Sequence, residues 1–280
     1  MNGAEWEGAL WGTRALDWAD VQQPTIRPVS AAVLGEFGGW QRRTLLDIGC
    51  GAGDFAGMAS ELGAKVSGLD ASAALIEIAR QRSPTGTFHV GDMQDIPFPD
   101  NHFSIVTAFN SVHFADDPAR AFAEMMRVTS PGGSMVVATW GPPAECDAVS
   151  YLLDLGSLMP QRPPGPQPLL DPTDPDDLRA LLTTAGLTLS PWRTVSCPWE
   201  YPDLSTALRG LLSTGPAAQA INHSGPARVT DIITESIAPY RRDDGSYLLS
   251  NTCYYLVALL SGTDAPARPP QPATPQEGRR

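Results

Sequence analysis

The sequence of 280 residues predicts an α/β fold: a doubly wound, mostly parallel sheet with a helical N-terminal segment and a helical cap. Three observations support this prediction. Residues 45–54 combine a short apolar run with a glycine-rich turn. Residues 54–110 then alternate between helical and strand patterns, which is typical of parallel strands joined by helices. Beyond about residue 200 the pattern is helical up to a last strand, which we expect to be antiparallel.

The stretch LLDIGCGAGD is the feature around which the other elements are arranged. Its apolar residues favour a buried parallel strand, with the carboxylate of Asp47 near the end of that strand. Gly49, Gly51 and Gly53 follow. Alternating glycines let the backbone turn tightly and remove every Cβ from the side that a ligand would approach. We therefore expect a binding turn between this strand and a helix over residues 54–62.

A second carboxylate, Asp70, ends the next predicted strand, residues 65–70. It lies about twenty residues past the glycines, where an acid bonds the ribose diol in nucleotide-binding folds. A dinucleotide is disfavoured, because Asp54 occupies the position of a required glycine and, with Asp47, would repel a pyrophosphate. S-adenosylmethionine, which has no phosphate and carries an ammonium and a sulfonium, suits this acidic turn better.

The motifs DIGCGAGDFA, GLDAS, GDMQDIPFPDNHFSIV and the stretch through MRVTSPGG resemble, in this order, those of class I S-adenosylmethionine-dependent methyltransferases. The subgroup is the one similar to ubiquinone- and menaquinone-biosynthesis and other small-molecule methyltransferases. The resemblance covers roughly residues 41–142 and implies a Rossmann-like fold with S-adenosylmethionine as the cofactor. The residues that we expect to bind the cofactor are Trp18, Asp47, Gly49, Gly51, Gly53, Asp70, Ala71, Asp92, Met93 and Asn110.

Asp92 and Met93 follow the third predicted strand, residues 87–90. In the resembled family an acid and an apolar residue at this place hold the adenine. The carboxylate accepts a hydrogen bond from the exocyclic amine, and the apolar side chain covers the ring. The alternative is that Asp92 only begins a turn.

Residues 1–40 are expected to form an N-terminal helical lid. Trp11 and Trp18 are seven residues apart, so they share one face if the segment is helical. One interpretation is that they pack the helix onto the sheet. The other, which the resemblance implies, is that the segment lies across the cofactor cleft, with Trp18 over the methionyl end and Trp11 facing the substrate.

The fourth predicted strand, residues 103–109, is apolar nearly throughout and should be central. Asn110 and His113 follow it and should face the reacting methyl group, because ligands of open α/β sheets lie beyond the carboxyl ends of the strands. His113 is the candidate general base, since an imidazole titrates at about pH 6.5; a structural histidine is the competing interpretation. Trp140, after a turn at 131–133 and a fifth strand, could line the substrate site or pack against the cap.

The methyltransferase domain is expected to span residues 41–261. Within its second half we expect a strand over 187–195, a cap insertion at about 200–245 and a last, antiparallel strand over 247–260 at the sheet edge. Residues 262–280 lack the side chains to build a core, and we expect them to be disordered.

The amino-acid composition indicates which classes of binding partner and cofactor this protein can have. The net charge of −12 disfavours nucleic acid and anionic membranes, since both would be repelled, and favours a small-molecule substrate. The four cysteines have no metal-binding spacing, which predicts reduced thiols and no metal site. Neither a signal peptide nor a membrane span is recognisable, so we expect a cytoplasmic protein, as a monomer or homodimer.

The leading hypothesis is an S-adenosylmethionine-dependent methyltransferase that acts on O, C or N of a small metabolite. The alternative is a protein that binds the same cofactor without methylation, such as a cyclase, or a binding protein, because fold does not fix chemistry. A nicotinamide-dependent oxidoreductase comes third.

Overall fold

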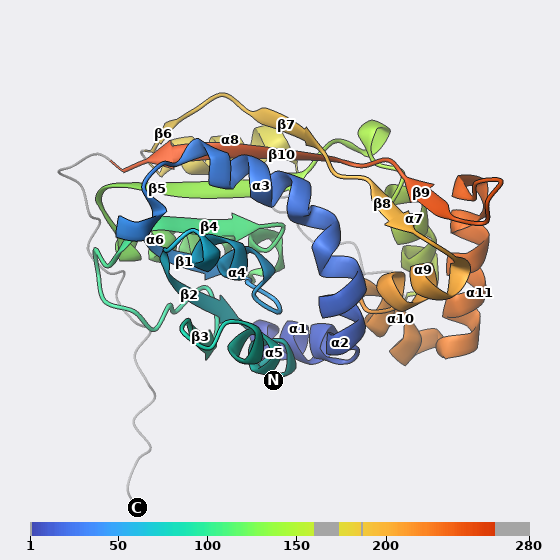
Figure 1. Ribbon diagram of the computed structural model, residues 1–280. Helices are drawn as coiled ribbons and strands as arrows, with labels where there is room; N and C mark the ends of the chain where they lie inside the picture. Colours follow the sequence, from blue (N-terminus) through green and yellow to red (C-terminus); the bar gives the residue numbers. More distant parts are fainter. Residues whose placement is uncertain (1, 160–173, 186, 261–280) are drawn as a thin grey trace, which may run out of the picture.

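The computed structural model describes residues 2–159, 174–185 and 187–260. These residues contain an eight-stranded sheet of order β3-β2-β1-β4-β5-β10-β6, in which β7 also pairs with β10 (Figure 1). Neighbouring strands from β3 to β5 are parallel, and β10 is antiparallel to β5, which confirms the predicted Rossmann-like fold. The strands are β1 (Thr44–Ile48), β2 (Lys65–Asp70), β3 (Thr87–Val90), β4 (Phe103–Phe109), β5 (Thr129–Trp140), β6 (Thr188–Leu189), β7 (Arg193–Ser196) and β10 (Thr252–Leu259).

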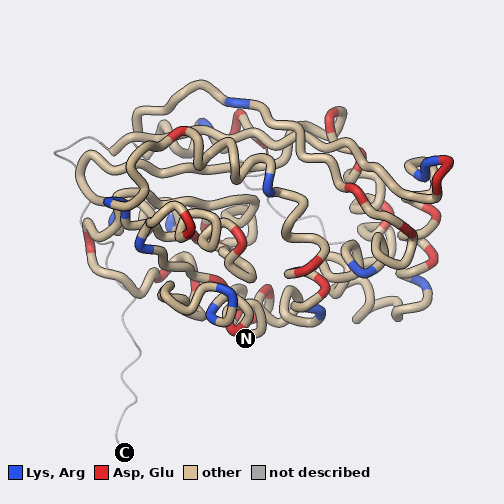
Figure 2. The backbone as a smooth tube through the Cα atoms, in the orientation of Figure 1, with Lys and Arg blue, Asp and Glu red and all other residues tan. Residues whose placement is uncertain are grey.

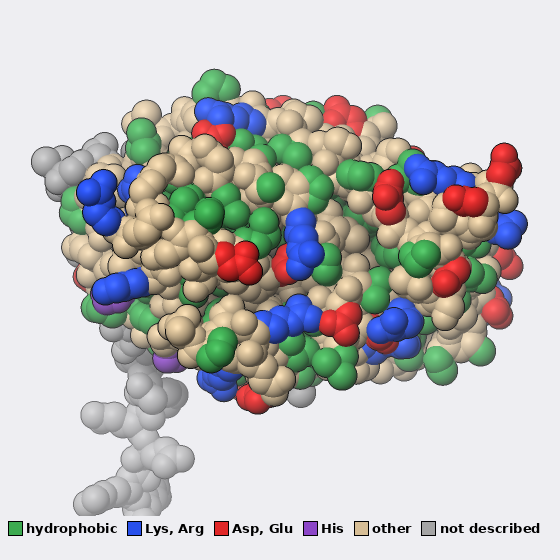
Figure 3. Space-filling model, in the orientation of Figure 1, with side chains coloured by type: hydrophobic (Ala, Val, Ile, Leu, Met, Phe, Trp, Pro, Cys, Tyr) green, Lys and Arg blue, Asp and Glu red, His purple; other side chains and the backbone are tan. Residues whose placement is uncertain are grey.

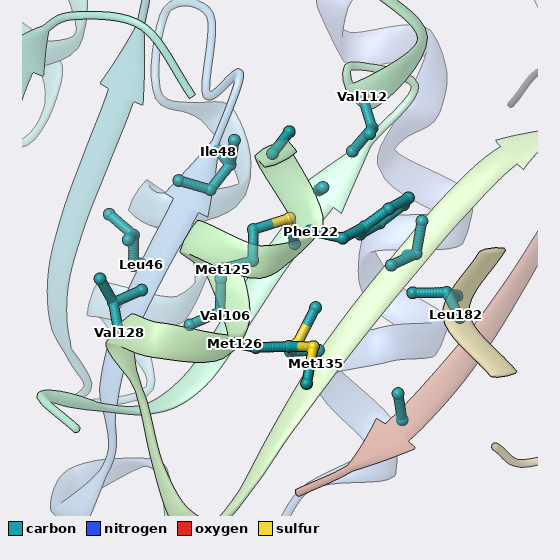
Figure 4. Packing of buried hydrophobic residues seen from close by; sticks show 14 of the residues in the cluster. Leu46, Ile48, Val106, Val112, Phe122, Met125, Met126, Val128, Met135 and Leu182 are labelled. Carbon is teal, nitrogen blue, oxygen red and sulfur yellow. The ribbon is translucent and has the colours of Figure 1, made fainter. Parts of the chain in front are cut away.

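Helices cover both faces of this sheet (Figure 1). On one face, α6 turns Phe122 and Met125 onto Val106 of β4, where all three side chains are buried (Figure 4). Asp117 begins α6 by accepting a hydrogen bond from the Arg120 backbone N–H, as a helix-capping side chain does. The helices packed along the sheet are α3 (Arg27–Glu36), α4 (Asp54–Glu61), α5 (Ala73–Arg82), α6 (Pro118–Val128) and α8 (Pro175–Thr184).

The N-terminal segment runs from the helices of the sheet to the cap (Figure 1). It consists of α1 (Gly3–Gly12), α2 (Ala15–Asp17), a π-helix over Trp18–Gln22 and a 3₁₀ turn over Gln23–Ile26. Helix α1 contacts both α5 and α10, so the segment links the sheet layer to the cap. π-helical turns are rare and often lie at functional sites.

A group of helices lies beyond the carboxyl ends of the parallel strands (Figure 1). Together with a two-stranded sheet of β8 and β9, it has its own buried apolar cluster. Its members are α7 (Val149–Ser157), β8 (Trp199–Tyr201), α9 (Leu204–Leu211), α10 (Gly215–Ser224), α11 (Pro226–Ile237) and β9 (Tyr247–Leu249). We refer to these six elements as the cap.

Three predicted elements differ from the structure. The strand expected over 187–195 is two short strands, β6 and β7, because Pro191 between them has no N–H to pair. The strand expected over 247–260 is β9 and β10, separated at Asn251, whose side chain accepts a hydrogen bond from Ala148 N–H at 3.0 Å. Strand β10 is not at the sheet edge as predicted, since β6 and β7 cover its outer side. The turn expected at 131–133 is an irregularity inside β5.

Positions of Lys, Arg, Asp and Glu are spread along the whole described backbone (Figure 2). Acidic and basic groups alternate across the face that Figure 3 shows. None of the helices in the described part of the chain is long and apolar enough to cross a membrane. The tail expected to be disordered, 262–280, lies outside the described residues.

Candidate functional site

A cavity of about 400 Å³ opens at the carboxyl ends of β1 to β5. The N-terminal segment and the cap line its other sides. This volume lies in the range of about 300–1,000 Å³ that is common for small-molecule sites. Of the thirteen residues predicted for cofactor, substrate or catalysis, the cavity brings together twelve: Trp11, Trp18, Asp47, Gly49, Gly51, Asp70, Ala71, Asp92, Met93, Asn110, His113 and Trp140. Gly53 does not line the cavity.

The glycines of the turn have positive φ angles, +70° at Gly49, +56° at Gly51 and +79° at Gly53. The side of the backbone where a Cβ would project is filled by the protein. A Cβ on Gly49 would lie 2.3 Å from the Ser111 Cβ, and one on Gly51 would lie 2.8 Å from the Gln23 amide nitrogen. The predicted reason for these glycines, room for a ligand, is therefore incomplete: they also let other segments of the chain pack against the turn.

Gln23 connects the N-terminal segment to this turn. Its side-chain nitrogen donates to the Cys50 carbonyl, and its side-chain oxygen accepts from the Ala52 N–H, both at 2.9 Å. The side chain is buried and lines the cavity. Sequence reasoning missed Gln23, because its partners lie 27 and 29 residues away and no local pattern indicates them.

Asp70 holds the turn from the other side. One carboxylate oxygen accepts the Gly51 N–H and the other accepts the Ser72 N–H, each at 2.8 Å. Burial raises the pKa of Asp70. Each oxygen keeps a further lone pair, so the carboxylate can still accept from a ligand hydroxyl. Ala71 follows, and its carbonyl lies so close to Gly8 of α1 that a Cβ there would be 2.2 Å from the oxygen.

Asp47 is buried at the end of β1 and accepts a hydrogen bond from the Thr107 hydroxyl at 2.7 Å. Burial raises its pKa to about 7, and the nearby charges of Asp70 and Asp54 act in the same direction. The three carboxylates therefore repel one another, and a positive charge in the cavity would relieve that repulsion.

Asp54 begins α4 and lines the cavity, but it is paired. Arg27 donates to both of its oxygens, at 2.9 and 2.7 Å. Arg27 thus compensates the charge of Asp54, and the carboxylates of Asp47 and Asp70 accept hydrogen bonds only from neutral groups among the described residues.

Asp92 and Met93 both line the cavity beyond β3. The Asp92 carboxylate accepts from the Gln94 N–H at 2.8 Å and from the Gln94 side-chain nitrogen at 3.1 Å. It therefore organises a turn while facing the cavity, and the two interpretations of Asp92 are compatible.

Asn110 follows β4 with a φ of +48°, an unusual value for a residue with a side chain. Both polar atoms of its amide are buried without a hydrogen bond of normal geometry. The thiol of Cys253 is its polar neighbour. His113 lies three residues further on, its ring 4.2 Å from that of Phe114, and also lines the cavity.

Trp11 and Trp18 meet edge to face, with ring centroids 4.7 Å apart, and Trp11 also contacts Phe114 at 5.4 Å. Both tryptophans line the cavity, so this segment does face the cleft. Glu7, which sequence reasoning also missed, accepts a hydrogen bond from Trp11, and burial raises its pKa.

The cap closes the remaining side of the cavity. Trp140 contacts Trp199 at 5.5 Å, and Trp199 contacts Tyr151 at 6.1 Å. Trp140 therefore both lines the cavity and packs against the cap. The cap residues of the lining that sequence reasoning missed are Tyr151, Leu152, Trp199, Thr214 and Pro216.

The charged side chains of the lining indicate which kind of ligand the cavity suits. Five carboxylates line it: Glu7, Asp47, Asp54, Asp70 and Asp92. Among the described residues of the lining there is no lysine or arginine. These groups suit a cationic ligand with hydroxyl donors and disfavour a pyrophosphate. Within the described ranges, no cluster of three or more His, Cys, Asp or Glu side chains could hold a metal ion.

Known proteins are similar to this chain. Residues 46–137 match the family model described as a methyltransferase domain. The malonyl-[acyl-carrier protein] O-methyltransferase of Serratia marcescens is 34% identical over 127 residues, which are 45% of this chain and 50% of the relative. The demethylmenaquinone methyltransferase of Renibacterium salmoninarum is 36% identical over 99 residues, 35% of this chain and 42% of the relative.

The match thus spans half or less of the length of these two relatives. Among solved structures, a putative methyltransferase from Bacillus halodurans has a TM-score of 0.56 at 18% identity, over 83% of this chain and 98% of the other. That likeness concerns the fold. The family match covers the segment from β1 to β5, so this part of the chain is similar to a methyltransferase domain.

Proposed function

We propose that this chain is an S-adenosylmethionine-dependent methyltransferase that transfers a methyl group to O, C or N of a small-molecule metabolite. The observation that carries the proposal is the group of neighbouring carboxylates at the turn: Asp47 is buried, Asp70 is half-buried, and Arg27 pairs with Asp54. A cationic adenosyl cofactor relieves their repulsion, whereas a dinucleotide would increase it.

Each part of the cofactor has candidate partners. Asp70 accepts from the ribose hydroxyls, Asp92 accepts from the adenine amine, and Met93 covers the ring. The backbone of Gly49 and Gly51 and the carboxylate of Asp47 face the methionyl part, with Asn110 and Trp18 beside them. Gly53 contributes through the packing of α4 and has no direct contact. Residues 1–40 act as a lid, and the cap closes over the acceptor.

The cofactor, when bound, supplies a methyl group that is already activated on sulfur. The protein then has to align the acceptor, exclude water and, for an acceptor that carries a proton, remove that proton. His113 is the base in this proposal and takes the proton on an imidazole nitrogen. The N-terminal segment and the cap keep water out of the cavity.

The test is incubation of the purified protein with methyl-labelled S-adenosylmethionine and a metabolite extract. We expect the label to appear in a small molecule. Cofactor binding without any transfer of label would contradict methylation and favour the alternative, a cyclase or binding protein that uses the same cofactor.

His113→Ala tests the base. We expect turnover to fall by about 100-fold while the affinity for S-adenosylhomocysteine stays the same, because general base catalysis contributes about 10²–10⁴-fold. His223→Ala in α10 is the control, since His223 does not line the cavity. Unchanged turnover in His113→Ala would remove this residue from the mechanism.

A further inference from the structure

The cavity has two parts of different chemistry. One part lies at the ends of β1 to β3 and contains Asp47, Asp70 and Asp92. The other lies between the N-terminal segment and the cap, and its lining includes Trp11, Phe114, Trp140, Tyr151 and Trp199. We call the second part the aromatic compartment. If the cofactor occupies the first part, as proposed above, the aromatic compartment is left for the acceptor.

Among the described residues, the aromatic compartment has no lysine or arginine side chain to hold an anion. The described residues that line the whole cavity include five carboxylates and no lysine or arginine. Glu7, the acid next to Trp11, lies at this end. An acceptor with a carboxylate would lose its hydration, find no lysine or arginine among the described residues of the lining and be repelled by Glu7. The faces of the aromatic rings carry negative partial charge and add to that repulsion.

The geometry of the rings suits a flat molecule. Trp140 and Trp199 meet at an interplanar angle of 76°, and Trp11 and Phe114 meet at 78°. Edge-to-face rings form walls against which a planar apolar ligand packs well. The indole of Trp11 also packs on the first turn of α10, where a Cβ on Gly215 would be 2.6 Å from its nitrogen. This contact closes the compartment between the N-terminal segment and the cap.

We propose that the acceptor is an uncharged aromatic molecule and that the aromatic compartment excludes carboxylates. The inference rests on the proposed methyl transfer and specifies its substrate class. The proposed substrate class differs from that of the relative named as a malonyl-[acyl-carrier protein] O-methyltransferase, because a malonyl group carries a free carboxylate.

Matched pairs of small probes test the proposal. 1-Naphthol, 2-naphthol and 4-phenylphenol are each compared with the corresponding carboxylic acid at neutral pH. Binding is measured by calorimetry with S-adenosylhomocysteine present at saturation. We expect at least one phenol to bind and its carboxylate to bind at least about 100-fold more weakly, because the carboxylate is buried without a partner.

A designed cation provides the second arm. Leu152 of α7 lines the cavity and its neighbour Leu153 does not, while both are exposed enough, at 39% and 69%, to accept a charged side chain. Leu152→Lys should strengthen carboxylate binding by about tenfold, since it adds a partner for the anion. Leu153→Lys is the matched control. It should leave the affinity for the phenol and the affinity for the carboxylate as in the wild type.

Trp140→Leu probes the aromatic walls. We expect it to weaken phenol binding by about fivefold, because ring contacts contribute modestly beyond the apolar area. The affinity for S-adenosylhomocysteine should stay the same. Trp6→Leu is the control, since Trp6 is exposed and lies outside the cavity lining.

Two results would overturn the proposal: equal affinity for a carboxylate and its phenol, or no binding of any of the three phenols. Either result with S-adenosylhomocysteine still bound would leave the proposed cofactor site standing. If the wild-type protein does not bind S-adenosylhomocysteine at all, the proposed function itself is wrong.

Discussion

The two parts of the cavity are built from the sequence in different ways. The acidic part comes from one stretch, in which Asp47, Asp70 and Asp92 each lie at or just beyond the end of a parallel strand. The aromatic compartment is assembled from distant places, with Trp11, Tyr151 and Trp199 meeting only in the folded chain. The acidic part also matches known methyltransferases, since the family match covers residues 46–137. Under the proposed function, the local motif would bind the cofactor, and the walls assembled from distant segments would select the acceptor.

The largest effect that we expect in the acidic part is that of Asp70→Ala. This substitution removes the acceptor of the Gly51 and Ser72 N–H groups together with the proposed ribose contacts. Each hydrogen bond to a charged group contributes about 1.5–3 kcal/mol, so affinity for S-adenosylhomocysteine should fall at least about 100-fold. Calorimetric titration measures this loss.

Asp231→Ala is the control for Asp70→Ala, because Asp231 lies on the exposed side of α11 outside the cavity lining. Wild-type affinity in Asp70→Ala would show that the ribose is held elsewhere. The acidic part would then not be the cofactor site.

Gly49→Ala should have the next largest effect, on the free energy of unfolding. A left-handed φ costs a residue with a Cβ about 1–2 kcal/mol, and the overlap with Ser111 adds about 1–3 kcal/mol. We therefore expect a total loss of about 2–5 kcal/mol, measured by urea unfolding.

Gly132→Ala is the matched control for Gly49→Ala. Gly132 has a similar φ of +74°, but a Cβ there would meet nothing within 4 Å. Its loss should be about 1–2 kcal/mol, from the backbone alone. Equal losses in the two variants would contradict the packing of Ser111 against the turn.

Asp47→Asn should have a smaller effect, which depends on pH. The folded protein keeps the Asp47 proton up to about pH 7, whereas the unfolded chain loses it at its ordinary pKa of 3.8. The folded state therefore binds more protons between these values, and the stability contributed by Asp47 falls as pH rises through that window. We expect Asp47→Asn to stabilise the unliganded protein at pH 8 by about 4 kcal/mol, with no gain near pH 4.

Thermal unfolding at several pH values measures this effect. The same variant should bind S-adenosylmethionine more weakly at pH 8, because it has lost a negative charge from the acidic part. A stability gain that is the same at every pH would contradict the buried, proton-holding state of Asp47.

The sequence predicted the acidic part well, since its strands and helices follow one another with regular apolar patterns. Asp70 and Asp92 lie where those patterns place them. The sequence did not predict the roles of Gln23, Glu7 and Trp199, and the reason is physical. Each contacts residues from distant segments, and a periodic pattern in the sequence does not indicate such contacts. The two divided strands escaped it as well, because Pro191 and Asn251 interrupt apolar runs that look continuous.

Parallel titrations of the wild-type protein with S-adenosylhomocysteine and with NAD test the central claim most directly. The claim is that the carboxylates of the turn accept a phosphate-free adenosyl compound and reject a pyrophosphate. We predict saturable binding of S-adenosylhomocysteine and no measurable binding of NAD. Binding of NAD that equals or exceeds that of S-adenosylhomocysteine would contradict the account.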